Sequence, residues 1–125
     1  MKGGSLMAPR LYDLPLADWP LLRPSLTRGV AAWSLLPAGW QAERITVARV
    51  APGGEFPPHR DDYHHVFWFL AGEGEGILAE EVYPIYPGRV AEVPAGTAHG
   101  YRNTGGEDLL LLSINARGDA AGKPE

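Results

Sequence analysis

The chain lacks cysteine, so disulfides, thiolate nucleophiles and thiolate metal ligands are all excluded. It has no apolar run of the roughly 18 residues that suggests a membrane-spanning helix. No charged segment followed by an apolar one opens the sequence, which argues against a secretion signal. Lysine and arginine form no cluster, and the formal net charge is −4, which argues against nucleic acid or an anionic membrane as partner. We therefore expect a cytoplasmic protein.

Helical periodicity is also missing, whereas glycine and proline recur between short apolar runs. Such punctuation is typical of β-strands joined by tight turns. We expect strands at residues 29–36, 44–51, 64–70, 76–80, 82–86, 89–93, 97–102 and 109–115. This pattern predicts a single all-β domain, built as a sandwich or barrel.

The first 27 residues are expected to form an extended arm, because Pro15, Pro20 and Pro24 forbid a helix of useful length. Residues 1–6 look like a remnant of cloning. The arm is apolar enough to pack, either over a sheet of its own domain or across to a second subunit. The barrel is expected to span residues 28–115, and residues 116–125 a flexible tail.

All four histidines lie in two short segments, which suggests one site assembled by folding. Side chains alternate faces along a strand. If the first segment runs extended without a bulge, His59, Asp61 and His65 point to the same side, and His64 points away. Together with His99 they offer three imidazoles and one carboxylate, a ligand set suited to Fe(II), Mn, Zn, Ni or Cu(II).

The second segment resembles the second motif of the cupin family, Gly-x5-Pro-x-Gly-x2-His-x3-Asn. Every fixed position of that motif is met, by Gly88, Pro94, Gly96, His99 and Asn103. The resemblance covers roughly residues 28 to 115. It implies a cupin-type double-stranded β-helix, that is, a jelly-roll barrel.

The first cupin motif, Gly-x5-His-x-His-x(3,4)-Glu-x6-Gly, is met only in part. His59 takes the first histidine position, and Gly72 closes the motif. His65 stands where the family usually has glutamate, and Asp61 where it usually has the second histidine. The total of three nitrogen donors and one carboxylate is unchanged, so the expected metal ligands are His59, Asp61, His65 and His99.

The resemblance further implies a small-molecule site inside the barrel. Our leading expectation is a metal-dependent enzyme acting on a small polar or carboxylated molecule by dioxygenase, isomerase or lyase chemistry. One alternative is a non-catalytic binding or sensor module. Another is a scaffold whose barrel is filled by phenylalanine. The fold alone does not choose between them.

Five further side chains are candidates for the site. Tyr63 and Tyr101 share the parity of the proposed ligands, so each can donate a proton or simply close the barrel mouth. Arg49 can clamp a substrate carboxylate if it faces the pocket, or it can lie on the outer face. Phe67 and Phe69 can line a substrate site or form core.

We expect a homodimer, because the strand that carries His64 and His65 has apolar side chains on its outward face. Val66, Trp68 and Leu70 point away from the proposed site, and together with Trp19 and Leu21 of the arm they are too apolar to remain in water. Exposed sheet edges of a jelly roll also need covering. Most homo-oligomers have two-fold symmetry.

Overall fold

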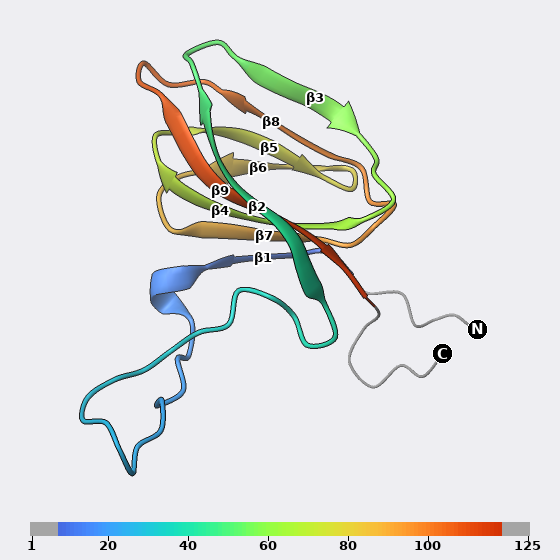
Figure 1. The fold of residues 1–125 in the computed structure, drawn as a ribbon. Helices are drawn as coiled ribbons and strands as arrows, with labels where there is room; N and C mark the ends of the chain where they lie inside the picture. Colours follow the sequence, from blue (N-terminus) through green and yellow to red (C-terminus); the bar gives the residue numbers. More distant parts are fainter. Residues whose placement is uncertain (1–7, 119–125) are drawn as a thin grey trace.

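The computed structural model describes residues 8–118, which form nine strands in two facing sheets (Figure 1). The strands are β1 (Arg10–Asp13), β2 (Gln41–Val50), β3 (Glu55–His59), β4 (His64–Ala71), β5 (Gly74–Leu78), β6 (Glu81–Ile85), β7 (Arg89–Val93), β8 (His99–Asn103) and β9 (Leu109–Arg117). Within the described part of the chain, the single helix is the three-residue 3₁₀ turn η1 (Leu14–Leu16). None of these residues forms a helix long and apolar enough to cross a membrane.

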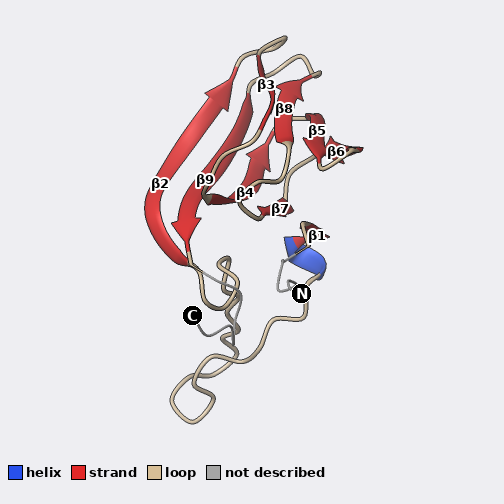
Figure 2. Cartoon of the chain, turned by 90° about the vertical axis from the view of Figure 1, so that its right-hand side faces the viewer, coloured by secondary structure: helices blue, strands red, loops and turns tan. Residues whose placement is uncertain are grey.

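One sheet has five strands in the order β1-β7-β4-β9-β2, and the other has four in the order β3-β8-β5-β6. Every neighbouring pair is antiparallel. The long strands β2 and β9 run side by side along one flank of the barrel (Figure 2). The all-β class and the double-stranded β-helix expected from the sequence are confirmed.

The core lies between the two sheets, and strand β4 shows how the sequence fills it. Phe67 and Phe69 are 4% and 0% exposed and belong to the inner cluster, whereas Val66 packs on the opposite face. The period-two alternation predicted for this strand is therefore confirmed. The inner cluster comprises Phe67, Phe69, Leu78, Tyr83, Ile85, Ala91, Val93, Leu109 and Leu111.

The outer face of the five-stranded sheet carries a second apolar cluster, built partly from the N-terminal segment. Buried Leu14 and Trp40 pack there against Val66 of β4, and Trp33 and Leu35 lie partly buried beside them. Leu14 of the arm and Trp40 of the loop after it therefore cover part of this sheet.

The strand expected at residues 29–36 is wrong. This segment is a loop whose single β-bridge joins Leu21 to Ala31. Its residues Trp33, Leu35 and Leu36 pack against the outer cluster of the sheet, and Trp33 donates a hydrogen bond from Nε1 to the Tyr12 hydroxyl at 2.9 Å. The apolar composition of this segment predicts that it packs against the protein, but it does not predict that its backbone pairs in a sheet.

Two strands were not predicted, β1 and β3. Strand β3 contains Pro57 and Pro58, and it lies at the edge of its sheet, the one place in a sheet where proline is tolerated. The strand β1 pairs with the edge of β7, and an ion pair between Arg10 and the buried Glu92, 3.4 Å apart, supports that pairing.

The terminal boundaries are partly described. Strand β9 continues through Arg117, two residues further than expected. The proposed cloning remnant at residues 1–6 and residues 119–125 of the proposed tail lie outside the described residues.

Candidate metal centre

Two of the candidate ligands are direct neighbours across a strand pair. His59, the last residue of β3, lies opposite His99, the first residue of β8. Each ring has its Nδ1 atom 2.8 Å from a backbone carbonyl two residues earlier, that of Pro57 for His59 and that of Thr97 for His99. A carbonyl can only accept, so Nδ1 carries the proton and the Nε2 lone pair of both rings is free to bind a cation.

The third imidazole comes from the opposite sheet. His65 is the second residue of β4, and its ring centroid lies 4.6 Å from that of His99. The expectation of one continuous extended stretch from His59 to His65 is wrong, because residues 60–63 form a turn that passes from one sheet to the other. The two side chains nevertheless converge, because each points into the space between the sheets.

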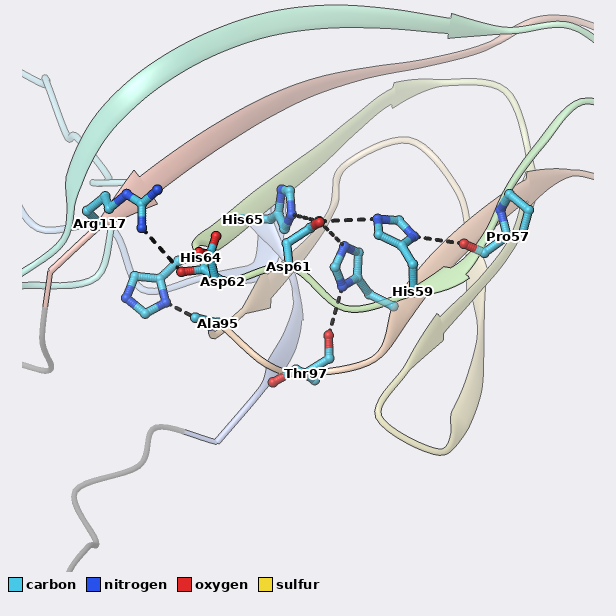
Figure 3. Close-up of polar contacts among 10 residues, drawn as sticks. Pro57, His59, Asp61, Asp62, His64, His65, Ala95, Thr97 and Arg117 are labelled. Atoms are coloured by element: carbon cyan, nitrogen blue, oxygen red, sulfur yellow. Dashed lines mark hydrogen bonds and ion pairs between the residues drawn. The ribbon is translucent and has the colours of Figure 1, made fainter.

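Asp61 lies in that turn, and one of its oxygens is the centre of the site (Figure 3). Its Oδ2 atom is 2.8 Å from Nε2 of His65, 3.2 Å from Nε2 of His59 and 3.4 Å from Nε2 of His99. The structure thus brings together the four residues that the sequence analysis proposed as ligands. His59, Asp61 and His99 satisfy the spacing of a metal-binding cluster.

The donor chemistry of this cluster fits a cation. The Nε2 atoms of His59 and His99 are acceptors, and an ionised Asp61 carboxylate is also an acceptor, so acceptors face one another with no proton between them. Nε2 of His99 is buried and makes no hydrogen bond. His65 donates from Nε2 to Asp61, and it becomes a ligand when its proton moves to Nδ1. A divalent ion would satisfy all four groups together.

The electrostatics of the site favour the metal-binding protonation states. Burial lowers the pKa of His99, because a charged imidazole loses its hydration there. For Asp61, burial acts to raise the pKa, but the hydrogen bond from His65 and the nearby imidazoles outweigh it, so the pKa of its carboxyl is lowered. At neutral pH this gives a neutral His99 and an ionised Asp61.

The turn before β8 fixes the geometry of the Asp61 loop. Gly96 has φ +85°, a conformation that favours glycine, and its N–H donates to the Asp61 carbonyl at 2.8 Å. The turn that bears Asp61 is thereby joined to the turn that leads into His99. The sequence analysis missed this contact, and it also missed the orienting carbonyls of Pro57 and Thr97. These contacts are made by backbone groups, so residue types in the sequence do not reveal them. In both cases the carbonyl lies two residues before the histidine that it orients.

His64 lies outside the site, as strand parity predicted. Its ring stacks on Trp40 with centroids 4.0 Å apart. Its Nδ1 accepts the Ala95 N–H at 2.8 Å, and its Nε2 lies 2.6 Å from the Gly118 carbonyl. This imidazole therefore links strand ends and does not face the other three.

We expect His64→Ala to leave the metal content of the purified protein near that of the wild type. The same change at His65 should remove most of the metal, because it deletes an imidazole that faces Asp61. The His64 variant should lose about 1–2 kcal/mol of stability with its hydrogen bonds and stacking. Elemental analysis and thermal unfolding measure the two effects. Loss of metal from the His64 variant alone would show that the strand register is wrong.

The four other aromatic candidates lie at different distances from the cluster. The Tyr63 ring lies 4.9 Å from the His65 ring, at the edge of the cluster. Tyr101 packs edge-on against Phe67 at 5.6 Å, and burial raises the pKa of its phenol. Phe67 lies 5.2 Å from His65 and forms the floor of the site, whereas Phe69 is completely buried beyond it.

Arg49 does not face the cluster, which corrects the hypothesis that it clamps a substrate there. Its neighbours Ala48 and Val50 pack against the inner core, so its own side chain points outward. The side chain is 75% exposed and lies 3.8 Å from Asp108. The alternation of β2 leaves the choice of face open because both of its faces carry apolar residues.

A sequence model described as a cupin domain matches residues 46–115, which is more than half of the chain. The chain belongs to the cupin family. Residues of both cupin motifs form the cluster around Asp61, and the aromatic floor under it belongs to the same domain.

The proteins that resemble this chain have names that refer to different molecules. Auxin-binding protein 1 of Arabidopsis thaliana is 35% identical over 116 residues, and the match covers 86% of this chain and 57% of that protein. A 5-nitrosalicylic acid 1,2-dioxygenase of a Bradyrhizobium species is 32% identical over 66 residues, 53% of this chain and 32% of that enzyme. The chain therefore spans about half or less of these relatives.

Among solved structures, a Thermotoga maritima protein described as a predicted oxalate decarboxylase superimposes with a TM-score of 0.57 at 27% identity. The match covers 59% of this chain and 65% of that one.

Proposed function

We propose that this cupin binds a divalent transition metal through His59, Asp61, His65 and His99. The observation that carries the proposal is the convergence of three imidazole Nε2 atoms on one carboxylate oxygen, within 2.8 to 3.4 Å. Fe, Mn, Zn and Ni all accept such a donor set. When bound, the metal would supply a Lewis acid and an open coordination position.

The ligand of this site is proposed to be a small organic acid. Apolar side chains fill the barrel interior, so access is from the side where His59 and Asp61 keep 27% and 24% of their side-chain surface exposed. Two of the similar proteins are named for organic acids, nitrosalicylic acid and oxalate, which supports this class. Phe67 would support the apolar body of the ligand from below.

We propose that the chain is an enzyme of dioxygenase, isomerase or lyase type. Tyr63 is the better placed of the two proposed proton donors, because its ring borders His65 at the edge of the cluster. Tyr101 packs among Phe56, Phe67 and Phe69, an environment that suits a wall of the site. The alternative of a scaffold cupin rests on the filled interior, which leaves little room for a bound molecule.

One experiment separates these possibilities. Protein loaded with each metal is incubated with oxalate and with salicylates, and oxygen uptake, carbon dioxide release and product NMR spectra are recorded. The control is the His99→Ala variant. Turnover by the wild type and not by the variant supports the enzyme. Metal-dependent binding of an acid without turnover supports the binding module, and failure to bind any of the metals contradicts the whole proposal.

A further inference from the structure

Strand β3 contains an irregularity directly before the candidate ligand His59. In the pairing of β3 with β8, Phe56 lies opposite Tyr101, whereas His59 lies opposite His99. Three steps along β3 therefore match two steps along β8, so β3 carries one extra residue, a β-bulge. A bulge changes the direction in which the following side chains point, and bulges are frequent beside functional sites.

This bulge determines the face of the sheet to which His59 points. Phe56 packs edge-on against Tyr101 with centroids 5.8 Å apart, and Tyr101 in turn packs on the inner core. Side chains alternate along a regular strand, so residues three apart point to opposite faces. A regular β3 would therefore turn His59 away from the cluster. The observed ring instead stacks on Phe56 at 4.2 Å and lies 4.3 Å from the ring of His99.

The bulge depends on a glycine in the neighbouring strand. Gly100 of β8 is buried, and it lies opposite the two residues Pro57 and Pro58. A Cβ atom at position 100 would lie 2.7 Å from the Phe56 carbonyl oxygen, 2.9 Å from the Pro58 nitrogen and 3.0 Å from the Pro57 carbonyl carbon. These distances are well below the optimal separation of about 3.5–4.0 Å. All three atoms belong to the backbone, so a side chain at this position would displace the strand itself.

The displaced strand would be β3, because it lies at the edge of its sheet. Strand β8 is paired on both sides, with β3 and with β5, whereas β8 is the one neighbour of β3 among the described strands. His59 would move with β3, since its ring stacks on Phe56 and its Nδ1 donates to the Pro57 carbonyl at 2.8 Å (Figure 3). Asp61 and His65 lie in the following turn and in β4, outside this contact.

We propose that Gly100 is a positioning residue of the metal centre, because it leaves room for the bulge that brings His59 to Asp61. This role rests on the metal binding proposed above. It assigns to Gly100 the choice between a site with four protein ligands and a site with three. Gly100 is not a fixed position of the second cupin motif, which surrounds it with His99 and Asn103. The motif therefore does not predict this role.

Gly100→Ala should lower the affinity for Zn²⁺ about 10- to 100-fold, the usual effect of losing a group that orients a metal ligand. Gly106→Ala is the matched control, because a Cβ atom there would meet no described atom within 4 Å. Competition with a chelator measures both affinities. Wild-type affinity in Gly100→Ala overturns the role of Gly100 and leaves the metal site standing. Failure of the wild type to bind Zn²⁺ contradicts the site and the role together.

A double-mutant cycle tests whether the effect passes through His59. His59→Ala removes the ligand, so adding Gly100→Ala to it should change the affinity for Zn²⁺ by less than about threefold. A further loss as large as in the wild-type background would show that residue 100 acts on the whole site. That result overturns the proposed positioning of His59.

The metal-free protein gives a second reading, from histidine tautomers in long-range ¹⁵N–¹H NMR spectra. His59 should carry its proton on Nδ1 in the wild type, because that atom donates to Pro57. Gly100→Ala should remove this preference. His64 is the internal control, since its Nδ1 accepts the Ala95 N–H in a contact that position 100 does not touch. Identical His59 signals in the two proteins overturn the proposal.

Deletion of Pro58 tests the steric argument even where Gly100→Ala folds poorly. With one residue opposite position 100, the ladder becomes regular, so a Cβ atom fits there and Phe56 and His59 stay on one face. Combined with Gly100→Ala, the deletion should restore folding and raise the affinity for Zn²⁺ toward that of the wild type. No gain from the deletion overturns the proposal.

Discussion

Asp61→Leu is expected to lower the affinity for Zn²⁺ or Mn²⁺ by about 100-fold or more. Even partners that only orient metal ligands contribute 10- to 100-fold to affinity. Asp61 places Oδ2 within 3.4 Å of all three imidazoles, and it is the carboxylate of the cluster. Without it, a doubly charged ion would keep its full charge among neutral rings in a partly buried place. Competition with a fluorescent chelator measures the affinity.

Asp61→His is the matched control for this change. It puts an imidazole at the position where the cupin motif usually has its second histidine, so it should retain metal better than Asp61→Leu does. Both variants should fold, because only the side chain at a turn is altered and Gly96 bonds the backbone carbonyl of residue 61. Wild-type metal affinity in Asp61→Leu would show that Asp61 is not a ligand.

Phe69→Ala should reduce the free energy of unfolding by about 3–5 kcal/mol, the usual cost of removing a fully buried phenylalanine. Phe69 has no exposed surface, and its ring packs against Phe67, Tyr83 and Tyr101. A small domain has only about 5–15 kcal/mol of stability, so the variant should unfold at markedly lower urea concentration. Urea titration followed by fluorescence measures this difference.

Val82→Ala provides the control, since Val82 lies on the surface of β6 and is 64% exposed. Its effect should stay within about 0.5 kcal/mol. A loss below about 1 kcal/mol for Phe69→Ala would mean that the barrel interior is not packed as described. In that case the argument for ligand access from the side of His59 and Asp61 would also fail.

The sequence predicted the strands that carry dense apolar alternation and are bounded by turn residues. Strand β7 was expected with its observed bounds, and β4 and β9 ended one and two residues further than expected. Each of these strands has a neighbouring strand on both sides. Side-chain packing and backbone pairing therefore favour the same alternating sequence. The two strands that were not predicted carry weaker patterns, because β1 has four residues and two of the five residues of β3 are proline.

The candidate site was predicted by a partly mistaken argument. Parity along one extended strand brought His59, Asp61 and His65 to one side, whereas the structure brings them together from two sheets joined by a turn. Both geometries place the side chains in the barrel interior. The local sequence does not reveal the turn, because no glycine or proline occurs in residues 60–63. The sequence also left open which way the Arg49 side chain points, because both faces of β2 carry apolar residues.

The most direct test of the metal centre is anomalous scattering from a crystal of the protein loaded with Zn²⁺. Data collected above and below the zinc absorption edge locate the ion independently of any assumed ligand. The proposed four-ligand site predicts one strong peak about 2.0–2.2 Å from Nε2 of His59, His65 and His99 and from a carboxylate oxygen of Asp61. A peak bound by other residues, or no peak at a stoichiometric concentration of zinc, would contradict it.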